Sequence, residues 1–165
     1  MNKSLISLMF VLLFMMGSCG GDDAPCLESN KFCHSHGGLS WSDASNNSMN
    51  WSDAIQYCKN LGGRLPKISE LRKLIQNCSA TITGGECGIT TDCLSFKDCW
   101  NNSCAECSEK YGGSGKYSVF GDNYWFWSSS EESENTDVIW CVDFSYGDIV
   151  RSGYENPDPY VRCVR

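Results

Sequence analysis

The chain has 165 residues, twelve of them cysteine, and a formal net charge of −7 at neutral pH. An acidic surface argues against nucleic acid and against anionic polymers such as sulfated glycans as partners, whereas it permits cations. The length suits one domain, and so many cysteines are typical of an exported protein held by disulfides.

The first element along the chain is an apolar run from Leu5 to Met16, preceded by the positive charge of Lys3. The run is too short to cross a bilayer as a helix, and its charged start is typical of a secretory signal peptide. The sequence MGSC that ends at Cys19 resembles the lipobox of bacterial lipoproteins, in which this cysteine is lipidated and becomes the first residue.

This resemblance implies a signal peptide at residues 1–18 and a lipidated tether with an N-terminal loop at residues 19–40. It also implies a protein anchored to the bacterial outer membrane through Cys19, either periplasmic or surface-exposed; Gly20 after the cysteine favours that membrane. Several acyl chains anchor a protein stably where one does not. The alternative is an ordinary signal peptide followed by a structural cysteine.

Residues 26–48 are predicted to be loop-like, because Ser, Asn and Gly are frequent and no apolar period holds. Cys26 and Cys33 could close a small loop there. Together with His34 and His36 they could instead form a zinc cluster, since zinc prefers cysteine and histidine ligands. Export favours the disulfide.

Two short amphipathic helices are predicted next. In the first, NWSDAIQYCKNLGGRLP, apolar residues recur at helical spacing, Asn50 or Ser52 can cap the start, and two glycines at 62–63 end the helix. The second, KISELRKLIQNC at residues 67–78, can be capped by Ser69. Its apolar face is made of Leu71, Leu74, Ile75 and Cys78.

Residues 79–123 are predicted to be an insertion held by disulfides, because they contain too few apolar residues for a core of their own. Six cysteines lie between Cys78 and Cys107, and each disulfide would contribute about 2–4 kcal/mol. Cys104 and Cys107 form a C-x-x-C motif, which can mark redox chemistry. No βαβ pattern surrounds it, so structural disulfides are favoured.

The last third of the chain is predicted to be β. An aromatic strand, YWFWSSS, is followed by DVIWCVDFSYGDIV, in which alternation predicts a half-buried strand and a hairpin turn at residues 146–148. YVRCVR then closes the chain. Two helices followed by an antiparallel sheet make an α+β fold. We expect Trp127 and Trp140 to be buried.

Two groups in this region are candidate binding residues. Tyr124 and Phe126 face away from Trp125 and Trp127 on an ideal strand, so they could form a ligand platform while the tryptophans enter the core. The loop EESENTD supplies four carboxylates, on Glu131, Glu132, Glu134 and Asp137. They could hold calcium, which takes six to eight oxygen ligands, but a solvated acidic loop is the favoured interpretation.

Three motifs taken together resemble one known family. They are WxxAxxYCxxLGGRLPxIxELRxL from Trp51, YWxWSSSE from Tyr124, and WxVDFxxG from Trp140, followed by a terminal VRCVR. The chain from residue 41 to 165 is thereby similar to the Lcl C-terminal domain family. The resemblance implies a C-type-lectin-like fold, similar also to formylglycine-generating enzymes, with two helices flanking antiparallel sheets. It also implies that Cys58 and Cys163 are bonded, tying the two ends of the domain together.

The function implied is a cell-surface lipoprotein whose lectin-like domain binds a glycan or a protein ligand, as in adhesion, without catalysis or a cofactor. Alternatives are an envelope structural module and a formylglycine-generating-like enzyme, whose reactive cysteine pair cannot be placed in this sequence. With Cys19 lipidated, eleven cysteines remain, so one must lack a partner within the chain. Cys141 is the candidate, as a covered thiol.

Overall fold

A computed structural model describes residues 25–107, 115–153 and 157–165. The predicted signal peptide, Cys19 and the tether up to residue 24 lie outside the described residues. The described elements are β1 (His34–His36), β2 (Leu39–Trp41), α1 (Trp51–Asn60), α2 (Ile68–Leu71), the 3-10 turn η1 (Arg72–Leu74), α3 (Phe96–Cys99), the 3-10 turn η2 (Asn102–Ala105), β3 (Trp125–Glu131), β4 (Ile139–Asp143) and β5 (Asp148–Ser152). A mixed fold with antiparallel sheets is thereby confirmed.

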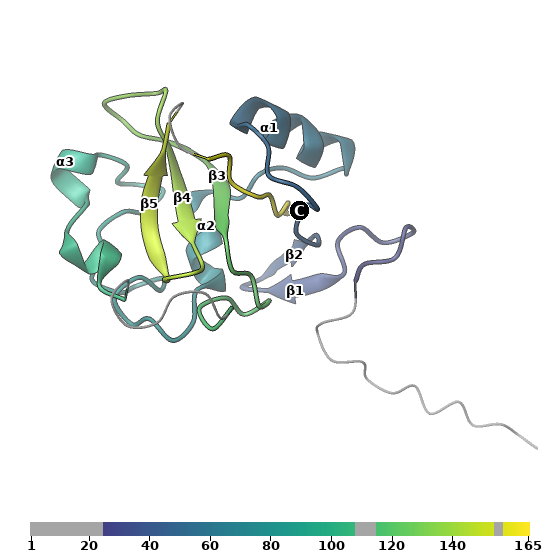
Figure 1. The fold of residues 1–165 in the computed structure, drawn as a ribbon, viewed down its shortest axis with the longest axis horizontal. Coiled ribbons are helices and arrows are strands. Elements are labelled where there is room, and N and C mark those ends of the chain that lie inside the picture. The colour runs from purple at the N-terminus through teal and green to yellow at the C-terminus, as the bar shows by residue number, and fades with distance from the viewer. Residues whose placement is uncertain (1–24, 108–114, 154–156) are drawn as a thin grey trace, which may run out of the picture.

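The central feature is the antiparallel sheet β3-β4-β5. In Figure 1 the sheet occupies the middle of the molecule, with α1 on the β3 side and α3 on the β5 side. All five residues of β4 are buried. The prediction of a half-buried strand is therefore wrong, because apolar side chains pack against both faces of the sheet.

The two faces of the sheet belong to two apolar clusters. Phe126 and Trp140 pack with residues of α2 and η1, whereas Trp127 and Cys141 pack with residues of α1. Trp127 is 4% exposed and Trp140 is fully buried, as predicted. This division explains why successive residues of β3 have different surroundings.

Helix α1 forms as its sequence predicts. The side chain of Asn50 accepts a hydrogen bond of 2.9 Å from the backbone N–H of Asp53, which satisfies one of the free donors at the helix start. Gly62 has a φ of 83°, the left-handed conformation that ends a helix. Ala54 and Cys58 are the buried side chains of the helix.

The second predicted helix is shorter than expected. Regular helix ends at Leu71, η1 adds one 3-10 turn, and Ile75 is extended. The chain after Leu74 pairs instead with residues 117–119, since the Val119 N–H donates to the Leu74 carbonyl over 2.9 Å. Ser69 does not cap; its hydroxyl accepts from the Thr91 N–H at 2.7 Å. This tertiary pairing overrides the helical pattern.

The N-terminal region is not a loop throughout. β1 and β2 form a short hairpin whose turn is Gly37-Gly38, both at positive φ. The end of the chain lies beside this hairpin (Figure 1), because Ser40 and Arg165 exchange backbone hydrogen bonds of 3.1 and 3.2 Å. The two ends of the domain are therefore in direct contact.

Five disulfides hold the described residues. Cys58 is bonded to Cys163 across 105 residues of sequence, as the family resemblance implies. The other pairs are Cys26–Cys33, Cys78–Cys107, Cys87–Cys104 and Cys93–Cys99. The C-x-x-C cysteines thus bond to other partners, not to each other. Among the cysteines that the structure describes, Cys141 is the free one, and it is buried as predicted.

The insertion is fixed to the core by more than disulfides. Ile89 and Tyr117 are buried in the larger apolar cluster. The buried guanidinium of Arg72 donates to the carbonyls of Thr81 and Ile82 over 2.8 Å, and also to that of Ile89. These hydrogen bonds compensate for the burial of the charge. The burial itself lowers the pKa of Arg72.

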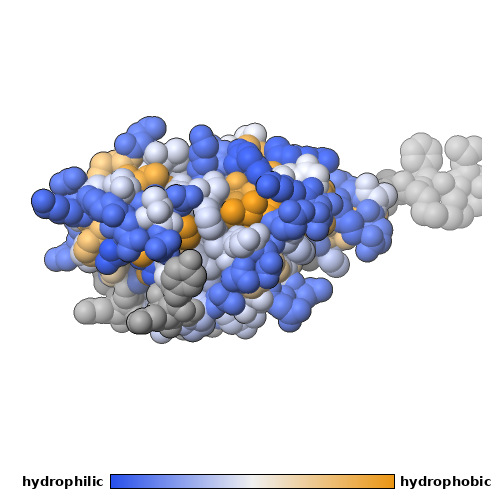
Figure 2. All heavy atoms as spheres, turned by 90° about the horizontal axis from the view of Figure 1, so that it is seen from above, coloured by the Kyte–Doolittle hydropathy of each residue, from blue (hydrophilic) through white to orange (hydrophobic). Residues whose placement is uncertain are grey.

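Figure 2 shows one face of the molecule, seen from above the view of Figure 1. Hydrophilic residues cover most of this face, and hydrophobic ones appear only in small separate areas. This pattern is typical of a domain exposed to water.

Candidate functional site

An open hollow beside the start of β3 contains Tyr124 and Tyr146, the two aromatic residues among the exposed large apolar side chains of the described residues. We call it the aromatic hollow. Its volume is about 450 Å³, within the usual range of ligand pockets. Four aromatic residues, two aspartates, two prolines and two serines line it: Tyr124, Trp125, Tyr146, Tyr160, Asp143, Asp158, Pro157, Pro159, Ser48 and Ser145.

The base of the aromatic hollow is fixed by backbone pairing. The Tyr160 N–H donates to the Trp125 carbonyl over 2.7 Å, and the Tyr160 carbonyl accepts from the Trp127 N–H at 3.1 Å. The C-terminal segment therefore continues the sheet beyond β3, in a parallel bridge. Trp125 and Tyr160 are held side by side although 35 residues separate them along the sequence.

The ring of Tyr124 stacks on the ring of Tyr160, with centroids 4.7 Å apart and planes inclined by 25°. Tyr124 nevertheless remains 56% exposed, and Tyr146 is 40% exposed. In the described part of the chain, Leu27 is the one other large apolar side chain that is exposed. Two of three such residues thus lie at this hollow, and exposed aromatic rings on a rigid base are typical of binding sites.

The charged groups among the described lining residues of the aromatic hollow are acidic. Asp143 ends β4 and is 4% exposed; one of its oxygens accepts the Ser145 N–H at 2.8 Å. Asp158 is exposed and also lines a neighbouring hollow of about 300 Å³, which contains Trp51 and Trp127. Among the described residues, no Lys, Arg or His lines the aromatic hollow.

The structure leaves one of the two predicted platform residues accessible and buries the other. Tyr124 lies in the aromatic hollow, but Phe126 is 1% exposed and packs edge-on against Phe144 at 5.5 Å. Phe126 is therefore a core residue, because the sheet is covered on both faces at this position. Trp125 does not enter the core as expected: it is only half-buried and forms part of the hollow.

Sequence reasoning did not identify Tyr146 and Tyr160. Tyr146 stands in the hairpin turn after β4, and binding residues are frequent on such loops. Tyr160 opens the terminal segment, and its position gives no such signal. Only the pairing of this segment with β3 brings it to Tyr124.

Two of the four carboxylates of the predicted calcium loop interact with side chains outside it. Glu132 is buried and pairs with Arg151 at 2.9 Å, while Glu134 accepts a short hydrogen bond from the Ser95 hydroxyl. Glu131 ends β3, and Asp137 lies exposed beyond the turn. Among the described residues these carboxylates are not gathered as a group of metal ligands, so the structure gives the calcium interpretation no support.

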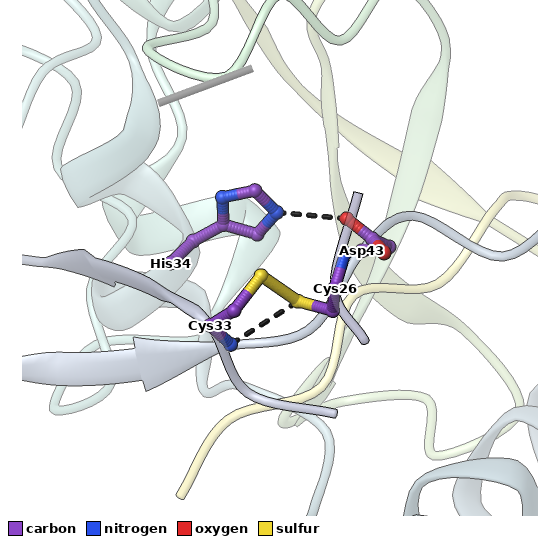
Figure 3. A group of neighbouring side chains, drawn as sticks. All are labelled: Cys26, Cys33, His34 and Asp43. Carbon is purple, nitrogen blue, oxygen red and sulfur yellow. Dashed lines mark hydrogen bonds and ion pairs between the residues drawn. A yellow bond between two sulfur atoms is a disulfide. The ribbon is translucent and has the colours of Figure 1, made fainter. Parts of the chain in front are cut away.

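A second place in the structure has side chains that could bind a metal. Within the described ranges it is the one group of three or more Cys, His, Asp or Glu residues whose ligand atoms lie close together. Figure 3 shows it: Cys26, Cys33, His34 and Asp43, whose ligand atoms all lie within 4.8 Å of one another. The two sulfurs are bonded to each other at 2.07 Å, so the thiolates that zinc requires are absent. The structure thus supports the disulfide over the zinc cluster.

Asp43 organises this corner as a structural residue. Its two oxygens lie 2.8 Å from His34 Nε2 and 2.7 Å from the Cys26 N–H. Burial opposes the ionisation of Asp43, but these two hydrogen bonds outweigh it and lower the pKa of the carboxyl. His34 also packs against the ring of Phe120, at 5.1 Å between centroids.

The free thiol is not placed for chemistry. Burial raises the pKa of Cys141 well above its usual value, so the thiol stays protonated at neutral pH. Its side chain is fully buried in the smaller apolar cluster with Trp127 and Ile139.

The comparisons with known proteins give one result. Neither curated proteins nor solved structures yield a match. No helix in the described ranges has the length and apolar character needed to span a membrane. The Lcl C-terminal domain family matches residues 32–165, which is most of the chain. The chain therefore belongs to the Lcl C-terminal domain family.

Proposed function

We propose that this chain is a binding module of a bacterial outer-membrane lipoprotein, with a C-type-lectin-like domain that holds a glycan in the aromatic hollow. The observation that carries the proposal is the pair of exposed tyrosines, Tyr124 and Tyr146, on a rigid base beside two carboxylates. No catalytic step is part of the proposal.

The chemistry of the hollow suits a sugar. A pyranose ring has an apolar face of C–H groups and a rim of hydroxyls. The flat ring of Tyr124, held by its stack on Tyr160, can cover the apolar face, while Asp158 and Ser145 can accept hydrogen bonds from the hydroxyls. Aromatic walls with a few polar groups are the usual composition of a ligand pocket.

The charges limit which glycans fit. Sulfated or carboxylated sugars would face Asp143 and Asp158 with no cation among the described lining residues to offset them. Calcium-mediated binding is not proposed, because the acidic loop is not assembled for it. Neutral and cationic sugars therefore remain as the candidate ligands.

The lipid anchor is a separate part of the proposal and rests on the lipobox resemblance at residues 16–19. Cells grown with labelled palmitate test it. We expect the wild-type protein to carry the label and Cys19→Ala to lack it. Equal labelling of both proteins would exclude Cys19 as the lipidated residue.

The binding function is tested on a glycan array with the wild type, Tyr124→Ala and Leu27→Ala. Leu27 is 71% exposed and does not line the hollow, so its variant controls for loss of exposed apolar surface. We expect Tyr124→Ala to weaken binding about tenfold or more, the effect of losing a hot-spot side chain, and Leu27→Ala to leave it unchanged. A wild-type protein that binds no glycan would favour the structural-module alternative.

A further inference from the structure

We propose that the aromatic hollow selects sugars that carry a protonated amine, such as β-1,4-linked glucosamine oligomers, over the same sugars in acetylated form. This inference rests on the proposed glycan-binding function and names its substrate class. It comes from the combination of carboxylates and aromatic faces in one cavity.

The first observation is an uncompensated negative charge. Asp143 is 4% exposed, yet the one hydrogen bond found for its carboxylate is from the Ser145 N–H at 2.8 Å. In the described part of the structure, no ion pair involves Asp143 or Asp158. A buried carboxylate without a cation is costly, so a ligand that brings a positive charge gains more here than a neutral one.

The second observation is the position of the rings. Tyr124, Trp125, Tyr146 and Tyr160 line the same cavity as these carboxylates. The face of an aromatic ring is negative and attracts a cation within about 6 Å of its centroid. The rings and the carboxylates therefore favour the same group on a ligand, an ammonium.

The third observation is the flat ring of Tyr124, which favours an amino sugar over a lysine side chain as the ligand. The exposed ring of Tyr124 is stacked on Tyr160 with the planes inclined by 25°, so the outer face of Tyr124 is a flat surface held in place. A pyranose covers such a surface with its C–H face and extends its substituents to the rim, where Asp158 lies exposed. A lysine chain has no flat face to match this surface.

Acetylation is the sharpest perturbation of the ligand. It removes the positive charge and leaves the ring, its hydroxyls and its linkage unchanged. An ammonium near one carboxylate at a protein surface supports a preference of about tenfold for the free amine. The preference should fall as salt rises, because Asp158 is exposed to screening.

The test is calorimetric titration of the full mature protein with a glucosamine hexamer and with the matched N-acetylglucosamine hexamer, in slightly acidic buffer. A lysine hexapeptide is the third probe. The variants are Asp158→Asn and, as control, Asp92→Asn, which makes the same charge change at an exposed residue that does not line the hollow. Thermal melting of each variant confirms that it is folded.

We expect the glucosamine hexamer to bind about tenfold more tightly than its acetylated form, and Asp158→Asn to reduce that ratio while Asp92→Asn keeps it. Equal binding of the two hexamers would overturn the amine preference and leave the glycan-binding function standing. Binding of neither hexamer would count against both proposals. A lysine peptide that binds as tightly as the amino sugar, or an equal loss in Asp92→Asn, would also overturn this inference.

Discussion

Removal of the Cys58–Cys163 disulfide tests how the two ends of the domain stabilise each other. Both residues are fully buried, and the bond spans 105 residues. In the chain-entropy estimate, a loop of that length contributes about 4.7 kcal/mol. The Cys78–Cys107 bond bypasses 29 of those residues, which lowers the value only to about 4.5 kcal/mol because the dependence is logarithmic.

The matched control is the Cys26–Cys33 disulfide, which spans 7 residues and is worth about 2.4 kcal/mol in the same estimate. Each pair is replaced by two alanines, so that no new thiol is left unpaired. Urea denaturation then gives the free energy of unfolding of each variant. We expect the Cys58/Cys163 variant to lose about 2 kcal/mol more than the control. Equal losses would refute the loop-closure reasoning.

Three further predictions concern the core, the free thiol and one surface ion pair. Trp140→Ala should lower the free energy of unfolding by about 3–5 kcal/mol, because the ring is fully buried and its indole N–H donates to a backbone carbonyl at 2.9 Å; a loss below about 1 kcal/mol in urea denaturation would contradict its burial. Cys141 should resist alkylation in the native protein and react after unfolding, as peptide mapping can show; rapid labelling of the native protein would contradict its burial. Burial opposes ionisation of Glu70, but the bidentate hydrogen bonds from Arg64, at 2.7 Å each, lower its pKa below the ordinary 4.5. The ionised carboxylate therefore stabilises the fold above pH 4.5 and loses that effect as pH falls through the lowered pKa, so the destabilisation by Glu70→Gln should shrink in acid; a constant loss from neutral to acid pH would argue against the pair.

Local signals were enough to predict α1. Its N-cap, apolar spacing and terminal glycines lie within residues 50–63, so no distant contact was needed. The same holds for the turn between β4 and β5. The Cys58–Cys163 bond was predicted through the family resemblance, and the buried Cys141 from the odd number of cysteines.

Other parts of the fold depend on distant pairing, which periodicity does not report. The helical pattern of residues 67–78 stops early because the chain after Leu74 pairs with residues 117–119. The hairpin of β1 and β2 had a local signal in Gly37-Gly38, but its strands have only three residues each. So short a strand carries no detectable alternation.

The site was predictable only in part for the same reason. Tyr124 could be proposed from its strand position, because alternation distinguishes the two faces. Alternation could not show that Phe126 is fully buried while Trp125 on the other face is only half-buried. Tyr160 pairs with Phe126 of β3, and the sequence alone does not indicate this pairing.

The most direct test of the glycan-binding claim is an NMR titration of the labelled protein with the glucosamine hexamer. The chain has six tryptophans, whose indole N–H signals report separate places in the fold. Trp125 lines the aromatic hollow, whereas Trp140 is fully buried in the core. We predict that the Trp125 indole signal and the Tyr124 backbone amide shift in a saturable way while the Trp140 indole signal stays in place. Saturable shifts confined to residues outside the hollow, or no shifts at all, would contradict the account.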